Sequence, residues 1–255
     1  MLLLSGLDHD GAPHVTPHSP FAGLSMRIAV SPSALRFAAC CAAISAVTTF
    51  LLWLLPRMVT PPEDFAATIA LHRNVWYLAR WWVNFAHTWL ALFAYLGAAA
   101  LLAGRSLALA VAGAVSFFVW AVTELVGVSV IVFAVNRTWR AAYETTGAEG
   151  QATLRTLLAG WDATWDAMYF LLLVAFLLGS LFFGIAAARG RGLERLVGAL
   201  LLAAVPLTAL IMAGGYAGAG WADGITAAVY PALQPVSRLL MGVWIWREAQ
   251  GRDVG

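Results

Sequence analysis

The chain has 255 residues, of which 62% are hydrophobic and only 11% are charged, and its mean hydropathy is +0.80. Soluble domains do not have this composition, so we expect an integral membrane protein. The net charge of +2 and the lack of a basic cluster interleaved with aromatic residues exclude a nucleic-acid-binding surface. All 15 Lys and Arg positions are Arg, and the richness in Ala, Leu and Gly is typical of a bacterial protein.

Residues 1–31 are predicted to form a flexible tail. No basic region precedes the short apolar segment at 1–4, so this is not a secretory signal, and Met26 is an alternative start. The segment contains three prolines and three histidines, and spacings of a few residues in a proline-broken segment do not predict a metal site. The histidines are His9, His14 and His18.

The rest of the chain predicts an all-α fold, a polytopic membrane bundle. Its apolar runs are close to the roughly 20 residues that span hydrocarbon, and they are too long for barrel strands. Six such runs give a single six-helix transmembrane domain at 32–247, followed by a C-terminal tail at 248–255. The runs are 34–55, 81–103, 107–135, 167–188, 196–216 and 225–246.

The two long connections, 56–80 and 136–166, are each predicted to hold an amphipathic helix at the outer membrane surface. In the first, Thr60 is placed as the N-cap before two prolines and Glu63, and apolar residues then recur at helical spacing. In the second, a similar stripe runs from Leu154 to Trp165. Such helices commonly anchor a bundle, and the alternative is a lid over an outer cavity.

The arginines between the helices predict the orientation. Short connections count most, and the turns at 104–106 and 189–194 are positively charged, so both termini are expected on the cytoplasmic side. The membrane is expected to be a bacterial cytoplasmic (inner) membrane. Most tryptophans then lie near the outer boundary. Belts of aromatic residues normally occupy both interfaces, and this excess on one side suggests an aromatic-lined mouth.

Glu124 and Arg238 are the two charges that lie deep inside apolar runs. A charge at membrane depth costs roughly 2.5 to 3.5 kcal/mol on insertion scales, so such residues usually face the protein interior. Counted from the outer end at about 1.5 Å per residue, His87 lies at roughly 10 Å, Glu124 at roughly 17 Å and Arg238 at roughly 20 Å. The helical spacing places further polar and aromatic residues on the same faces. The resulting candidate ligand-binding set is Asn84, His87, Trp120, Glu124, Asp166, Tyr169, Tyr230, Gln234 and Arg238.

Three arrangements of these side chains stay open. Glu124 and Arg238 would neutralise each other as a buried structural ion pair. His87 would be a neutral imidazole bonded to Glu124 or to a backbone carbonyl. Alternatively, Glu124 and His87 would act as catalytic acid and base.

No other signature of chemistry is present. The sequence has no nucleophile elbow, P-loop, dinucleotide glycine motif or helical HExxH, so we predict no cofactor. His87 is the sole histidine within a span, which argues against a bis-histidine haem and leaves open only the ligation of a pigment or haem by this one histidine. Cys40 and Cys41 are adjacent in one helix and point in different directions, which predicts neither a disulfide nor a metal pair.

In its helix order and in two sequence features, the chain resembles a group of bacterial six-helix integral membrane proteins catalogued as domains of unknown function. The two features are the basic turn before Gly192-Leu193-Glu194-Arg195-Leu196-Val197-Gly198-Ala199 and the last helix ending Met241-Gly242-Val243-Trp244. The resemblance covers roughly residues 34–246 and implies a six-helix fold. It implies no catalytic residues, and the tryptophan-rich outer connections depart from that group.

The sequence therefore predicts a membrane protein with an outward-facing polar and aromatic cavity that binds a small lipophilic or amphipathic ligand, as a receptor, carrier or ligand-holding protein. One alternative is an accessory subunit of a larger respiratory or photosynthetic membrane complex. Another is an intramembrane enzyme that uses Glu124 and His87. The expected partners are the lipid bilayer, a lipophilic small molecule, and a membrane protein or a second copy of the chain.

Overall fold

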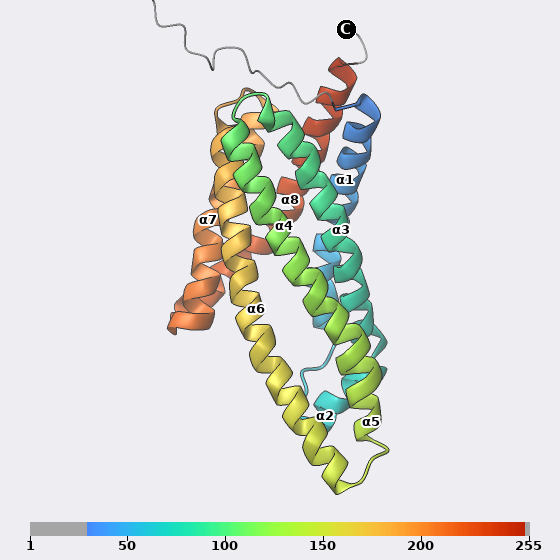
Figure 1. The fold of residues 1–255 in the computed structure, drawn as a ribbon. Coiled ribbons are helices and arrows are strands. Elements are labelled where there is room, and N and C mark those ends of the chain that lie inside the picture. The colour runs from blue at the N-terminus through green and yellow to red at the C-terminus, as the bar shows by residue number, and fades with distance from the viewer. Residues whose placement is uncertain (1–29, 253–255) are drawn as a thin grey trace, which may run out of the picture.

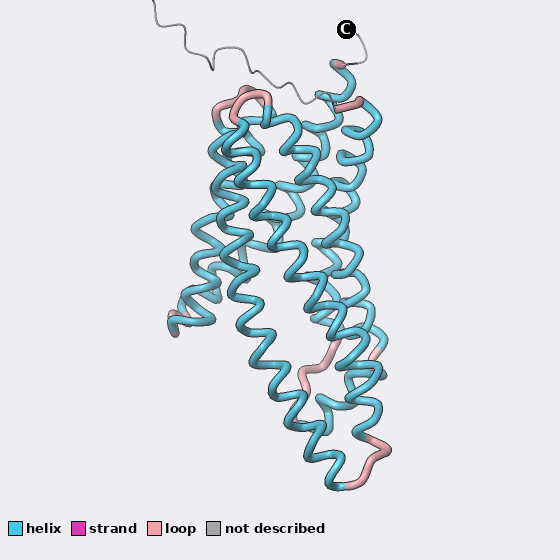
Figure 2. Tube along the Cα trace, viewed as in Figure 1, coloured by secondary structure: helices cyan, strands magenta, loops and turns pink. Residues whose placement is uncertain are grey.

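The computed structural model describes residues 30–252, apart from the side chain of Asp223, and every regular element in that range is helical (Figures 1 and 2). The histidines of the predicted tail lie outside the described residues. The elements are α1 (Pro32–Leu54), η1 (Leu55–Met58), α2 (Phe65–Ala70), η2 (Leu71–Arg73), α3 (Val75–Ala103), α4 (Leu107–Ser129), η3 (Val130–Arg140), α5 (Ala141–Tyr143), α6 (Ala148–Ala188), α7 (Leu193–Ala217) and α8 (Trp221–Gly251).

Local sequence explains where the first long helices begin. Ser31 caps α1 because its hydroxyl accepts from the backbone N–H of Ala34 at 3.2 Å, and Pro32 follows at the first helical position, where its missing N–H costs nothing. Asn74 caps α3 by accepting from the N–H groups of Trp76 and Tyr77.

The six long helices form a closed ring in chain order. Each packs against the next, from α1 through α3, α4, α6 and α7 to α8, and α8 packs back against α1. The guanidinium of Arg252 donates to the carbonyl of Val30 at 3.4 Å, so the end of α8 lies beside the start of α1. The α3–α4 and α6–α7 turns are at this same end, at the top of Figure 1, and α2 and α5 are at the opposite end.

Five of the described helical segments are long and apolar enough to cross a membrane, which makes this a multi-pass membrane protein. They are Pro32–Met58, Val75–Ala103, Leu107–Tyr143, Ala148–Ala188 and Leu193–Ala217. The predicted sixth span exists as the helix α8, but α8 is not among these five. Gln234, Arg238 and two internal prolines make it more polar than the others. By length and composition five helices therefore qualify as spans, and the predicted count of six is not confirmed.

The two long connections differ from the two predicted surface helices. The first contains the six-residue α2 and the short helical turns η1 and η2, and α2 is capped by Asp64 instead of Thr60. The second is not a separate helix, because α6 runs without a break from residue 148 to residue 188. Its extension is held by side-chain packing. Leu158 is buried with Ile69 and Val135, and Trp161 and Trp165 pack against a cluster that includes Trp81 and Val128.

The helix that begins as α4 continues through a π-helical stretch, Val130–Arg140, into α5. The buried Asn136 side chain donates to the carbonyl of Ile131 at 2.9 Å and accepts from Arg140 at 2.7 Å. Arg140 also donates to the Tyr77 hydroxyl of α3 at 2.9 Å. These bonds satisfy backbone and side-chain groups at a place where the regular helical ladder changes.

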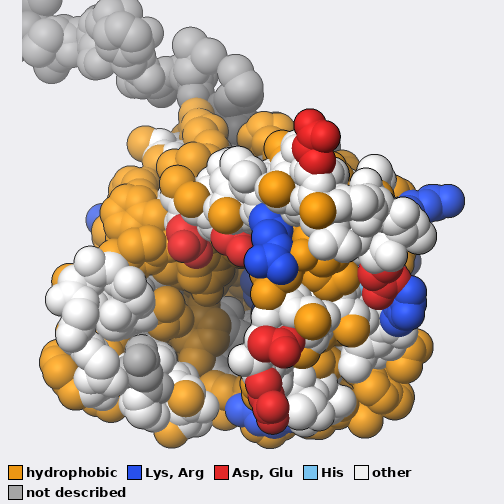
Figure 3. All heavy atoms as spheres, turned by 90° about the horizontal axis from the view of Figure 1, so that it is seen from below, with side chains coloured by type: hydrophobic (Ala, Val, Ile, Leu, Met, Phe, Trp, Pro, Cys, Tyr) orange, Lys and Arg blue, Asp and Glu red, His pale blue; other side chains and the backbone are white. Residues whose placement is uncertain are grey.

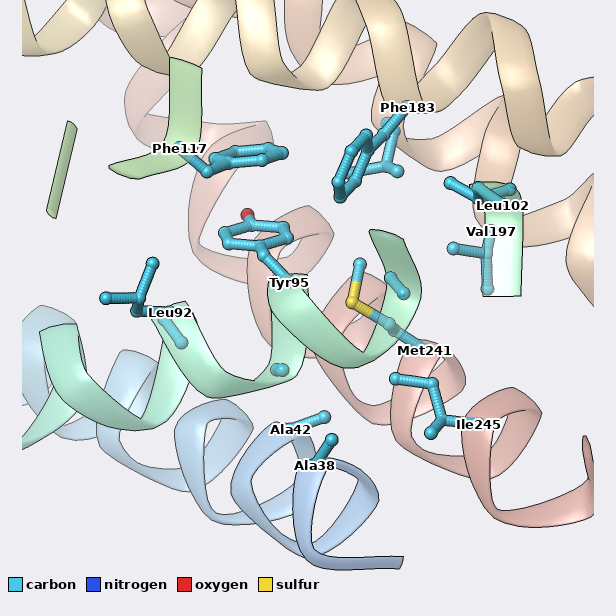
Figure 4. Packing of buried hydrophobic residues seen from close by; sticks show 14 of the residues in the cluster. Ala38, Ala42, Leu92, Tyr95, Leu102, Phe117, Phe183, Val197, Met241 and Ile245 are labelled. Carbon is cyan, nitrogen blue, oxygen red and sulfur yellow. The ribbon is translucent and has the colours of Figure 1, made fainter. Parts of the chain in front are cut away.

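An apolar and aromatic core fills the bundle on the side of the chain termini. Figure 4 shows how its buried side chains pack. The Tyr95 ring of α3 stacks on Phe117 of α4 with an interplanar angle of 9°, and Phe183 of α6 meets both rings edge-on. Met241 and Ile245 of α8 are fully buried beside them. This core closes the ring at one end, so polar side chains can gather only farther along the bundle.

Candidate functional site

A cavity of about 360 Å³ lies inside the ring, next to the aromatic core. Eight of the nine side chains in the predicted ligand-binding set line it, and they come from four helices. They are Asn84 and His87 of α3, Trp120 and Glu124 of α4, Tyr169 of α6, and Tyr230, Gln234 and Arg238 of α8. The cavity is thus a single compartment with both deep charges in its wall.

Asp166 is the predicted residue that does not line this cavity. Its side chain is exposed, and its backbone carbonyl accepts from the Tyr216 hydroxyl at 2.8 Å. Asp166 and Tyr169 are both on α6, but only Tyr169 is on the wall, because a helical spacing of three residues turns the two side chains by about 60° from each other.

Glu124 is held by an amide rather than by a cation. Its carboxylate accepts from the Asn84 side chain at 2.5 Å, and the residue is 8% exposed. This bond joins α4 to α3 across the cavity wall. It gives the deep carboxylate a fixed donor inside the bundle, which buried charged groups need.

Arg238 has a different environment. It is 3% exposed, and its guanidinium carbon lies 4.6 Å from the centre of the Tyr95 ring and 5.9 Å from that of Trp120, within the range of cation–π attraction. Within residues 30–252, no acceptor bonds its Nη1 atom and no salt bridge joins it to Glu124. The predicted ion pair is therefore not formed, although both residues line the same cavity.

Within residues 30–252, His87 does not bond to Glu124, one of its two predicted partners. Its Nδ1 atom lies 2.9 Å from the hydroxyl of Thr48 on α1, and its ring meets Trp120 edge-on. Thr48 is also 3.1 Å from the carbonyl of Ser45, to which its hydroxyl donates. A neutral imidazole in this position must then donate from Nδ1, which leaves Nε2 as an acceptor.

An apolar wall completes the cavity, and its residues were not predicted. Leu172, Leu173 and Phe176 follow Tyr169 on the same face of α6, so helical spacing from that one residue would have found them. The α1 and α7 contributions carried no comparable signal, because Leu52 and Ile211 are ordinary apolar residues in apolar runs. The remaining lining residues are Thr49, Trp53 and Pro231.

The molecule is hollowed on the end that carries α2 (Figure 3). Hydrophobic side chains line the floor of this hollow, and acidic and basic side chains stand on one side of it. Trp53, near the α2 end of α1, belongs to the cavity wall, and the guanidinium of Arg57 lies 3.9 Å from the centre of its ring. An aromatic ring and a positive charge, those of Trp53 and Arg57, are therefore in contact on the side of the cavity that is nearest to the α2 end.

The described residues offer no site for a metal ion, since no three His, Cys, Asp or Glu side chains gather in them. Comparison of the chain with known protein families, with characterised proteins and with solved structures finds no match. The resemblance to bacterial six-helix membrane proteins stays a prediction, and function must be argued from the cavity itself.

Proposed function

We propose that this multi-pass membrane protein holds a small lipophilic or amphipathic molecule in its cavity, as a receptor, carrier or ligand-holding protein. The observation that carries the proposal is the convergence of Asn84, Glu124, Gln234 and Arg238 on one cavity of about 360 Å³ with an apolar wall. Ligand sites are typically concave, largely apolar and of roughly 300 to 1,000 Å³, with a few polar groups that orient the ligand. A volume at the lower end of this range suits one small molecule.

The proposal includes six crossings and a bacterial cytoplasmic membrane with both termini in the cytoplasm. Two features support it. The start of α1 and the end of α8 are adjacent, which requires an even number of crossings if every long helix spans the membrane. The short turns at that same end contain Arg105, Arg189 and Arg191, and short basic connections favour the cytoplasm. The hollow end then faces outward.

Binding without chemistry is favoured over an intramembrane enzyme because of the partners of the two candidate catalytic residues. Glu124 is bonded to Asn84, and His87 is bonded to Thr48. In the described residues no bond joins these two groups to each other, and each is held by a side chain of a neighbouring helix.

Filling the cavity tests the proposal. Leu173 lines the cavity and is buried, whereas Leu171, two positions earlier on α6, is 49% exposed on the outer face of the bundle. We expect native mass spectrometry of the protein, extracted in mild detergent, to find one small molecule per chain in the wild type and in Leu171→Trp. Leu173→Trp should lose it.

Equal amounts of the same molecule in both variants would contradict the proposal, as would its absence from the wild type. Migration only as part of a larger assembly of different proteins would instead support an accessory subunit. Circular dichroism and thermal unfolding of both variants check that the helices are retained.

A further inference from the structure

We infer that the molecule held in the cavity carries an oxyanion, a carboxylate or a phosphate, and that this group binds to Arg238. The inference rests on the proposed function and specifies the chemical class of the ligand. It starts from the side chain of Arg238, which lines the cavity and is only 3% exposed, that is, 97% buried. The Nη1 atom of its guanidinium has no acceptor within residues 30–252.

A buried guanidinium without an acceptor is costly, since an unsatisfied charged donor loses its hydration and receives nothing in return. The faces of Tyr95 and Trp120 offset part of this cost, but an aromatic face accepts no strong N–H bond in the guanidinium plane. The planar fork of Arg matches carboxylate and phosphate oxygens, so an oxyanion is the ligand group that best completes this site.

The protein's own deep carboxylate is already engaged. Glu124 accepts from Asn84 of α3, which holds it on the α3–α4 side, whereas Arg238 projects from α8. The oxyanion of the ligand is therefore expected at the α8 wall, beside Gln234, which is also buried and lines the cavity.

A second lining residue indicates the same ligand chemistry. The indole N–H of Trp53 is buried and has no acceptor in the described part of the chain. Two donors in the cavity wall thus lack acceptors, one on α8 and one on α1. The apolar side chains of Leu172, Leu173 and Phe176 provide the surface for a hydrocarbon chain or ring attached to the oxyanion.

The test compares three probes with the same hydrocarbon chain: decanoate, decyl phosphate and decanol. Isothermal titration calorimetry with the protein in lipid nanodiscs, with empty nanodiscs subtracted, gives the affinity of each. For the wild type we expect one or both anions to bind more tightly than decanol by a factor on the order of ten or more. The tighter of the two anions identifies the head group.

Variants then assign the preference to Arg238. In Arg238→Gln the preference for the anion should fall to about twofold or less, while decanol still binds. Arg238→Lys keeps the charge without the planar fork and should retain part of the preference. Arg195→Gln removes the same charge at an exposed position far from the cavity wall and should leave the preference unchanged.

The outcomes separate the two proposals. Equal binding of decanoate, decyl phosphate and decanol to the wild type would overturn the oxyanion inference and leave a lipophilic cavity. Saturable binding of none of the three would contradict the proposed function itself. An anion preference that persists in Arg238→Gln would place the anion elsewhere and overturn the assignment to this residue. The comparison among probes on the wild type needs no variant to fold.

Discussion

Arg238 shows how one side chain defines the chemistry of this cavity. Its guanidinium lies over the rings of Tyr95 and Trp120, which stabilise the positive charge on that side without a counter-ion. Glu124, a few helices away around the ring, is satisfied by the amide of Asn84. The two charges are therefore structurally independent, and this independence predicts how each responds to substitution.

Glu124→Gln should be tolerated, with a loss in unfolding free energy of less than about 1 kcal/mol, because the new amide oxygen still accepts from Asn84. Thermal unfolding in lipid–detergent micelles measures the loss. Asn84→Leu is the control, since it leaves the buried carboxylate without its donor and should cost about 1.5 to 3 kcal/mol. A loss of about 3 to 5 kcal/mol in Glu124→Gln would instead indicate an ion pair with Arg238.

The cavity residues could be predicted one by one, but their partners could not. A charge or histidine inside an apolar run indicates its own burial, and this placed Glu124, Arg238 and His87 in one layer of the bundle. Which groups they bond to depends on which helices are neighbours. The sequence does not show that α1 lies beside α3, so it gave no sign that Thr48 would be the partner of His87.

At the scale of the elements, small residues let the helices approach closely. Gly113 of α4 lies beneath the ring of Phe183 of α6, and a Cβ added there would be 2.1 Å from the ring. Because close backbone approach is a main source of helix association in membranes, the α4–α6 contact depends on this glycine.

Gly113→Ala should lower the unfolding free energy by about 1 to 3 kcal/mol, because the fully buried Phe183 has little room to move. Gly160→Ala is a matched control within α6, where nothing lies within 4 Å of the added methyl. It should be neutral or stabilising by up to about 1 kcal/mol, because Ala favours the helix over Gly. Equal effects of the two substitutions on thermal unfolding would contradict the packing described for Gly113.

The elements also show where sequence patterns mislead. Asp162 and Asp166 interrupt the apolar run, which is why the sequence predicts a span that begins at residue 167. The helix nevertheless continues back to residue 148, since Leu158 and Trp165 bury their apolar surface against other elements. Polarity marks where an apolar environment ends, whereas tertiary packing decides where the helix ends.

In the whole molecule, the connections between the long helices lie at two opposite ends of the bundle. Ser106 and Gln250 lie at the end of the bundle where α1 starts, and Thr145 lies at the opposite end, beyond α5. Gly220 is the N-cap of α8, and the helix itself has 31 residues. At 1.5 Å per residue its length is about 46 Å, which is enough to cross a bilayer.

Single cysteines in a background without the two native ones test this arrangement. We expect a membrane-impermeant maleimide to label Thr145→Cys and Gly220→Cys from outside intact cells, and Ser106→Cys and Gln250→Cys only after the membrane is opened. Labelling of Gly220→Cys and Gln250→Cys from the same side would show that α8 does not cross. Labelling of Ser106→Cys alone from outside, with Thr145→Cys protected, would reverse the orientation.

Buried polar side chains converge on one cavity, and we propose that this cavity holds an amphipathic molecule. The most direct measurement is an electron cryomicroscopy map of the protein in lipid nanodiscs. We expect non-protein density between α3, α4, α6 and α8 that reaches hydrogen-bonding distance, about 3 Å, from Nη1 of Arg238. A map in which Arg238 bonds directly to Glu124, or in which side chains fill the cavity completely, would contradict this proposal.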